Sequence, residues 1–217
     1  YTIRQLFVRE GAISKNEVDE IWLNNRPETV EVAKDAFDKL SYRGLTSSAI
    51  AVAESKEHAL SSLKLSTNPT ILVLDAVEKP GNLGAMIRTA DATAIDAVIC
   101  CDTATDIYNP NVIRSSVGCI FGVPIAVGSR EEIHEWLKSN QINIFTASLK
   151  ASLPYTEVNF KESAAFVLGT EASGVDPLWE EVSTQNVIIP MLGKNDSLNV
   201  SIAAAVLLYE TLRQRSL

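Results

Sequence analysis

Polar side chains that could bind a ligand or assist a reaction follow apolar segments at three places in this chain. The first place is residues 75–91, where a Pro-Gly turn leads into a helical pattern that contains Asn82, Gly84 and Arg88. An arginine on a helix of otherwise small and apolar residues loses hydration, so it needs an anionic partner. The segment therefore predicts either an internal ion pair between Arg88 and Asp91 or an arginine that meets an anionic ligand.

The second place is residues 167–175, where an apolar strand ends in a glycine-bounded loop that carries one carboxylate, Glu171. Ser173 lies in this loop, but the Gly-x-Ser-x-Gly pattern of a nucleophilic serine is not met. The chain has two histidines, and we expect both on the solvated surface, His58 in the N-terminal part and His134 on a charged helix. A hydrolase that uses a serine–histidine pair is therefore disfavoured.

The third place is residues 188–201, where an apolar run leads through a polar turn into an Ala-rich helix. A polar loop between a buried strand and a buried helix is where open α/β proteins hold their ligands. Ser197 or Asn199 could equally serve only to cap the helix. A further segment, residues 108–118, places Arg114 among hydroxyl groups near a helix start, which suits a phosphate or a surface arginine without contacts.

Alternating strands and helices must position these loops. Apolar runs typical of buried strands occur at 71–74, 97–100, 124–127, 142–145, 165–168 and 187–189. Helical patterns lie between them at 82–93, 111–119, 130–139, 177–183 and 199–214. This alternation predicts an α/β fold with a mostly parallel sheet that helices cover on both faces.

The N-terminal part predicts a separate small module. A polar stretch that ends in proline, residues 61–69, is typical of a linker, so we place the domains at 1–66 and 67–217. Short strands are expected at 6–8, 21–23 and 49–53, with a helix at 31–40. The chain starts with Tyr1, and we expect this small α/β module to be incomplete at its N-terminus.

Composition narrows the class of protein. Hydrophobic residues make up 46% and charged residues 21% of the chain, and neither a membrane span nor a signal peptide is recognisable. The three cysteines show no metal spacing, which predicts buried thiols, no metal and a reducing, cytoplasmic location. The net charge of −8 disfavours nucleic-acid binding through overall positive charge, although a local basic patch remains compatible with it.

The loops together resemble the motifs of one enzyme family. Residues 82–90, 168–174 and 189–201 resemble, in order, the three motifs of the SpoU (TrmH-like) family in the SPOUT superfamily, and residues 109–118 also match. Members of this family are RNA 2′-O-ribose methyltransferases that use S-adenosylmethionine (AdoMet). The resemblance extends from about Leu72 to the C-terminus. Residues 1–66 are more weakly similar to the L30e-like substrate-binding domain of many members.

The resemblance implies a fold, an activity and partners. The fold is an α/β methyltransferase domain with a trefoil knot, and the chain works as a homodimer with sites at the subunit interface. The activity is methyl transfer from AdoMet to a ribose 2′-hydroxyl of structured RNA, with ribosomal RNA favoured over transfer RNA. Neither a metal nor a membrane is implied.

The resemblance also implies site residues. Arg88 positions the ribose and stabilises the developing alkoxide, and four further residues order the site around it. We call these five residues together the reactive group. The reactive group is Asn82, Arg88, Glu171, Ser197 and Asn199. The expected AdoMet-binding residues are Gly169, Thr170, Gly174, Ile189, Met191 and Leu198. The expected RNA-binding residues are Asn109, Arg114 and Ser115.

Two other functions are compatible with parts of this sequence. A catalytically silent RNA-binding or ribosome-assembly protein could have the same fold, but the reactive group is retained here. A nucleotide-dependent enzyme of the doubly wound class could use residues 75–88 as its phosphate loop. The Gly-x-Gly-x-x-Gly fingerprint and the lysine of a P-loop are both missing, which disfavours that second alternative.

Overall fold

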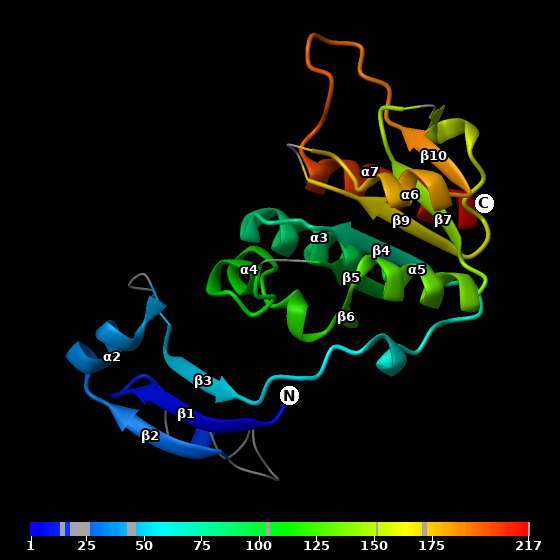
Figure 1. Cartoon of the computed structure of the whole chain (residues 1–217). Coiled ribbons are helices and arrows are strands. Elements are labelled where there is room, and N and C mark those ends of the chain that lie inside the picture. The colour runs from blue at the N-terminus through cyan, green and yellow to red at the C-terminus, as the bar shows by residue number, and fades with distance from the viewer. Residues whose placement is uncertain are drawn as a thin grey trace. The chain divides into compact units, whose positions relative to one another are not determined.

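The chain folds as two compact units. The computed structural model describes residues 1–13, 16–17, 27–42, 47–102, 105–150, 152–170 and 173–216. The units are Tyr1–Glu57 and His58–Leu217 (Figure 1). The larger unit starts before the expected boundary between residues 66 and 67, because the segment 58–66 packs on it. The Val127 N–H donates to the His58 carbonyl over 2.7 Å, and Leu60 and Leu63 pack against its core.

His58 is a half-buried residue of the larger unit, and our expectation of a surface histidine in the N-terminal part was wrong. Its Nδ1 lies 2.8 Å from the Ile125 carbonyl oxygen, and its Nε2 lies 2.7 Å from the Tyr108 hydroxyl. The ring can thus donate to the carbonyl and accept from the hydroxyl. Both partners are at least 50 residues away along the chain, which is why the local pattern did not reveal them.

The smaller unit is a three-stranded sheet with one described helix. Its elements are β1 (Ile3–Arg9), β2 (Glu28–Val32), α2 (Lys34–Leu40) and β3 (Ala49–Ala53). Strand β1 lies in the middle, parallel to β2 and antiparallel to β3. The helix expected at 31–40 starts later, because residues 28–32 pair with β1. The strand expected at 21–23 lies outside the described residues.

The larger unit is built on a seven-stranded sheet. The strands are β4 (Thr70–Asp75), β5 (Ala97–Cys101), β6 (Ile125–Gly128), β7 (Asn143–Ala147), β8 (Leu153–Pro154), β9 (Ala164–Leu168) and β10 (Gln185–Ile188). Their order is β6-β5-β4-β9-β7-β10-β8, and every pairing among these strands is parallel. The predicted parallel sheet is confirmed, and the two-residue edge strand β8 is an addition that the pattern did not predict.

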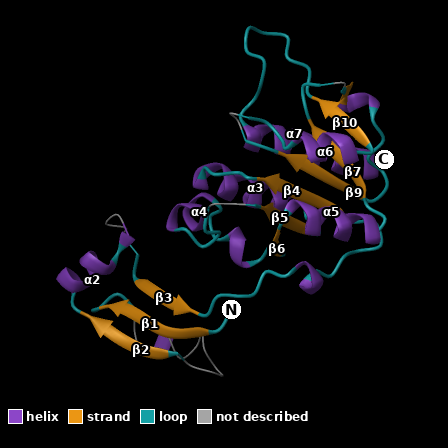
Figure 2. Cartoon of the chain, in the orientation of Figure 1, coloured by secondary structure: helices purple, strands orange, loops and turns teal. Residues whose placement is uncertain are grey.

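Helices cover both faces of this sheet, as Figure 2 shows. They are α3 (Pro80–Ala92), α4 (Pro110–Ser115), α5 (Arg130–Ser139), α6 (Pro177–Val182) and α7 (Val200–Arg215). Short 3-10 helices occupy η2 (Leu60–Ser62), η3 (Cys119–Phe121) and η4 (Tyr155–Glu157). Within the described ranges, no helix is long and apolar enough to cross a membrane.

The sheet separates two hydrophobic cores. Successive residues of a strand face opposite sides, so Leu72 and Leu74 of β4 join a core with α3 and α7. Ile71 and Val73 join the other core, which contains α5 and the fully buried Trp179 of α6. Burial on both faces explains why the strands are continuous apolar runs and not alternating ones.

Helices α3 and α4 cross at Gly84. A Cβ atom at this position would overlap Ser115 Oγ and lie 2.6 Å from the Val112 carbonyl oxygen, so only glycine allows the crossing. Helix α3 begins at Pro80, with Lys79 at the N-cap position, and not at Asn82 as the asparagine had suggested. Proline is favoured in the first helical turn because its fixed φ suits the helix and its missing N–H needs no partner there.

The cysteines are mostly core residues. Cys100 and Cys101 are buried, as expected, and Cys119 is half-buried. Burial raises the pKa of Cys100 to about 12, and burial together with the nearby Asp75 also raises the pKa of Cys101. Both groups therefore remain neutral thiols at physiological pH.

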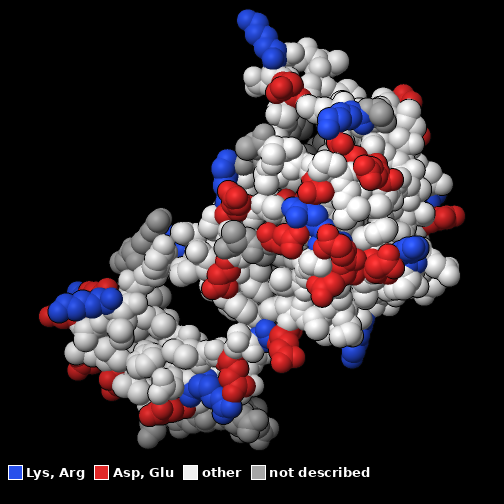
Figure 3. All heavy atoms as spheres, in the orientation of Figure 1, with Lys and Arg blue, Asp and Glu red and all other residues white. Residues whose placement is uncertain are grey.

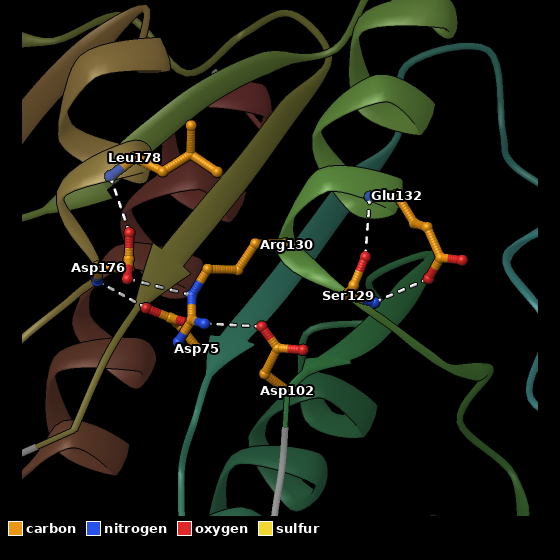
Figure 4. Close-up of polar contacts among 7 residues, drawn as sticks. All are labelled: Asp75, Asp102, Ser129, Arg130, Glu132, Asp176 and Leu178. Carbon is orange, nitrogen blue, oxygen red and sulfur yellow. Dashed lines mark hydrogen bonds and ion pairs between the residues drawn. The ribbon is translucent and has the colours of Figure 1, made fainter.

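A cluster of charged side chains around the buried Asp75 ties together the carboxyl ends of two strands and the starts of two helices (Figure 4). Asp75, only 2% exposed, accepts a hydrogen bond from Arg130 Nε over 2.9 Å and another from the Asp176 N–H over 2.7 Å. The same guanidinium donates to Asp102 Oδ2 over 2.7 Å. Asp176 also caps α6 through its side chain, so the cluster fixes where that helix starts.

Replacing Arg130 with methionine is expected to lower the free energy of unfolding by about 3 kcal/mol, because the buried carboxylate of Asp75 loses its cation. Urea unfolding followed by circular dichroism measures this change. Lys138→Met on the same helix is the control, since its exposed pair with Glu135 contributes at most about 1 kcal/mol. An Arg130 variant as stable as this control would contradict a structural role for the cluster.

Candidate functional site

A cavity of about 450 Å³ lies at the carboxyl ends of β9, β7 and β10, which are neighbours in the sheet. This size suits a small ligand or cofactor. The first half of α7 closes one side of the cavity through Val200, Ala203 and Leu207. All six residues expected to bind AdoMet contribute to its lining: Gly169, Thr170, Gly174, Ile189, Met191 and Leu198.

The loop after β9 is a tight turn whose glycines are required by its geometry. The Thr170 N–H donates to the Gly174 carbonyl over 2.9 Å, and the Gly174 N–H donates back to Thr170 over 3.0 Å. A Cβ atom on Gly169 would overlap the Gly174 carbonyl group and lie 2.5 Å from Val175 N. Gly174 itself has a φ of +73°, a left-handed conformation that favours glycine. Glu171 lies outside the described residues, so the structure does not place its carboxylate.

The loop after β10 ends at Asn199, which is the N-cap of α7. Its Oδ1 accepts hydrogen bonds from the Ser201 N–H at 3.0 Å and the Ser201 hydroxyl at 2.6 Å. Its Nδ2 donates to Asn82 Oδ1 over 3.2 Å. The structure therefore brings together two residues of the predicted reactive group that are 117 positions apart. Ser197, just before them, lines the cavity.

Arg88 lies on an exposed side of α3, away from the buried residues Met86, Ile87 and Ala90. Within the described part of the chain it forms no ion pair, so the internal pair with Asp91 that the sequence allowed is not present. The expectation that Arg88 is desolvated was also wrong for this single chain, because the surrounding apolar side chains point to the opposite side of the helix. Its guanidinium is available to a ligand or partner.

The three residues expected to contact RNA have different surroundings. Asn109 caps α4, with its Oδ1 accepting from the Asn111 N–H over 2.9 Å. Ser115 turns its hydroxyl into the crossing of α3 and α4, where it donates to the Asn111 carbonyl over 2.7 Å. Only Arg114 presents an exposed charged group. The RNA contacts of all three residues stay predictions.

Among the wall residues that the sequence patterns did not predict are three polar residues that contact one another. Glu180 of α6 lines the cavity together with Ser148 and Lys150, which follow β7. The Ser148 hydroxyl donates to Glu180 Oε1 over 2.6 Å, and Lys150 Nζ lies 3.4 Å from Oε2. The hydrogen bond from Ser148 lowers the pKa of Glu180, so this carboxylate is ionised. The order of strands, which no local pattern contains, is what places the end of β7 beside the other two loops.

Known proteins resemble the chain over most of its length. Residues 69–209 match the model of the SpoU rRNA Methylase family. The chain is 35% identical over 178 residues to the 23S rRNA (guanosine(2553)-2′-O)-methyltransferase RlmP of Bacillus subtilis. This alignment covers 82% of this chain and 70% of that protein. It is 36% identical over 189 residues to the 23S rRNA (guanosine-2′-O-)-methyltransferase RlmB of Bordetella pertussis. This second alignment covers 85% of this chain and 77% of that protein.

Solved structures share the fold. The SpoU methyltransferase AviRb of Streptomyces viridochromogenes in complex with AdoMet superposes with a TM-score of 0.87 at 27% identity, covering 99% of this chain and 83% of AviRb. The AdoMet-bound rRNA methyltransferase of Sinorhizobium meliloti gives 0.89 at 25% identity, covering 98% and 80%. Because the family model spans nearly all of the larger unit and these relatives agree with it, the chain belongs to the SpoU rRNA methylase family.

Proposed function

We propose that this protein transfers a methyl group from AdoMet to a ribose 2′-hydroxyl of structured RNA, with ribosomal RNA as the substrate. The observation that carries the proposal is the cavity whose wall contains all six residues expected to hold AdoMet. The names of the relatives, which describe 23S rRNA 2′-O-methyltransferases, support the same reaction.

The cavity fits AdoMet in size and chemistry. Apolar side chains from β7, β9, β10 and α7 suit the adenine ring, and the main-chain groups near Gly169, Ile189 and Leu198 offer donors and acceptors for its edge. Bound AdoMet supplies an electrophilic methyl group. The protein holds this group close to the ribose hydroxyl, which converts an encounter between two molecules into a reaction within one complex.

Arg88 is the residue we assign to the ribose. Its guanidinium is always protonated, so its main contribution is to position the RNA and to stabilise negative charge that develops on the 2′-oxygen. The hydrogen bond between Asn82 and Asn199 links the start of α3 to the start of α7, and α7 also lines the cavity. This link fixes the helix that carries Arg88 relative to the methyl donor. Roles for Ser197 and Glu171 in ordering the site are carried over from the family motifs.

RNA is expected to approach from the side of α3 and α4. Acidic side chains gather on the face drawn in Figure 3, in the region of α5. This helix carries Glu131, Glu132 and Glu135. Phosphates are repelled by such a face at distances up to the Debye length, about 8 Å at physiological salt. Arg88 and Arg114 are both exposed and lie on α3 and α4. A local basic area of this kind is how a chain with a net charge of −8 can bind RNA.

A homodimer is proposed from the surface of α7. One side of this helix is buried through Ala204, Leu207 and Leu208. The other side exposes Ile202 by 52%, Tyr209 by 51% and Leu212 by 42%. Their spacing of seven and three residues places them on one stripe of the helix. A second copy of the chain would cover this stripe, as the family resemblance implies.

Other properties implied by the resemblance stay predictions. These are a trefoil knot in residues 67–217, an L30e-like architecture for residues 1–66 and a cytoplasmic location.

Replacing Arg88 with alanine is expected to abolish methyl transfer while AdoMet affinity is nearly unchanged. Ribosomal RNA from a strain that lacks the protein should lack one 2′-O-methylated ribose, detected by mass spectrometry. The wild-type gene should restore this ribose and Arg88→Ala should not, since loss of one charge-stabilising donor costs roughly 100-fold or more in rate. Calorimetric titration with AdoMet provides the control. An equal loss of binding would indicate a structural arginine, and an unchanged ribose pattern in the deletion strain would favour the catalytically silent alternative.

Replacing Leu198 with glutamate is expected to weaken AdoMet binding by roughly tenfold or more, because a charge is placed in an apolar wall of the cavity. Leu192→Glu is the matched control. It lies in the same loop, is 99% exposed and does not line the cavity, so its affinity for AdoMet should match the wild type. Equal affinities of the two variants would contradict this placement of the cofactor. Calorimetry or equilibrium dialysis measures both.

Replacing Ile202 with glutamate is expected to convert the dimer into monomers, because a charge would be buried between two α7 helices. Sedimentation velocity measures the change in mass. Leu40→Glu, at a residue 56% exposed on the smaller unit, serves as the control and should leave the mass unchanged. A wild-type protein that sediments as a monomer at micromolar concentration would contradict the proposed interface.

A further inference from the structure

Glu180 of α6 places a carboxylate in the cavity wall, where neighbouring side chains hold it. Its side chain is 19% exposed, and two neighbouring side chains contact its carboxylate oxygens. Ser148 Oγ holds Oε1 at 2.6 Å, and Lys150 Nζ is 3.4 Å from Oε2. The Ser148 oxygen in turn accepts from the Lys150 N–H over 3.0 Å, which fixes the hydroxyl. The carboxylate is therefore oriented before any ligand binds.

This carboxylate has acceptor positions to spare. An ionised carboxylate can accept about four hydrogen bonds. Ser148 and Lys150 supply two, and among the described residues no further side chain or N–H group donates to it. Because Glu180 lines the cavity, the unused positions are accessible to a ligand there.

A neutral pair of hydroxyls satisfies these positions better than a cation does. Lys150 already balances the charge of Glu180, so an ammonium group would have to compete with it. Two neighbouring hydroxyls donate two hydrogen bonds and bring no charge with them. Hydrogen bonds to a charged acceptor are also the stronger kind. In AdoMet, the only pair of neighbouring hydroxyls belongs to its ribose.

Glu180 and Arg88 lie on helices that pack on opposite faces of the sheet. Helix α6, which carries Glu180, packs through Trp179 on one face of the sheet. Helices α3 and α7, which meet at Asn82 and Asn199, pack on the other face. Glu180 is therefore carried by a different helix, on the other face of the sheet, from the residue assigned to the RNA ribose.

We propose that Glu180, oriented by Ser148, accepts hydrogen bonds from the 2′- and 3′-hydroxyls of the AdoMet ribose and thereby makes the cavity selective for a ribonucleoside. This inference rests on the proposed function, in that AdoMet must occupy this cavity. It assigns to α6 a positioning residue that the three sequence motifs do not contain.

The test is a binding experiment with the complete chain and three ligands. The ligands are S-adenosylhomocysteine and its 2′-deoxy and 3′-deoxy forms, measured by calorimetric titration. The wild-type protein is expected to bind each deoxy form roughly 10- to 100-fold more weakly, the value of a hydrogen bond to a charged group. Glu180→Gln should bind the parent compound more weakly and should largely lose this discrimination.

Two further variants control the experiment. Glu181→Gln makes the same change of charge on the neighbouring, exposed residue of α6, which does not line the cavity, and should discriminate as the wild type does. Ser148→Ala leaves the carboxylate in place but frees its orientation, so it should reduce the discrimination in part. Thermal unfolding checks that all variants are folded.

The outcomes separate this inference from the proposed function. If Glu180→Gln weakens the binding of all three ligands by the same factor, or leaves all three affinities unchanged, the carboxylate does not contact the ribose and the inference is wrong. Binding of S-adenosylhomocysteine by the wild type without discrimination also contradicts the inference alone. Failure of the wild type to bind any of the three would contradict the proposed function, and the inference with it.

Discussion

Parallel pairing of β9 with both β4 and β7 is the interaction on which the site depends. Each central strand is buried on both faces, so its position is held by apolar contacts on two sides as well as by hydrogen bonds. Because parallel strands end at the same edge of a sheet, segments that follow β4, β7, β9 and β10 must gather there. The cavity is formed by three of these segments and by the helix that follows the last one.

Polar contacts then connect the gathered loops to one another. The buried Asp75 at the end of β4 receives hydrogen bonds from Arg130 and from the main chain of Asp176. Asp176 closely follows the turn that begins at Gly169, so the cluster holds one end of a loop that lines the cavity. On the opposite face of the sheet, Asn82 and Asn199 connect α3 to α7. The proposed cofactor site and the helix with Arg88 are thus held by contacts on both sides of the sheet.

Much of this architecture follows from local sequence patterns. All six apolar runs of the larger unit are strands, and α5 occupies the expected residues 130–139. Such agreement is expected for strands buried on both faces, since they admit few polar residues. The predicted helix starts were less accurate than the predicted strands, because Pro80 allows α3 to begin before Asn82. The surroundings of His58 and Arg88 could not be predicted from local sequence patterns, since they depend on which distant segments of the chain pack nearby.

The sequence by itself determined the element types, the positions of the loops and the residues of the three motifs, because propensity, apolar periodicity and motif spacing are local properties of the chain. Only the tertiary structure decided that β7 lies between β9 and β10, and hence that Ser148 and Glu180 share a cavity with Gly169 and Leu198. Strand order is decided by long-range packing of apolar faces, which a linear pattern does not record. The same reason explains why the exposure of Arg88 required the folded chain.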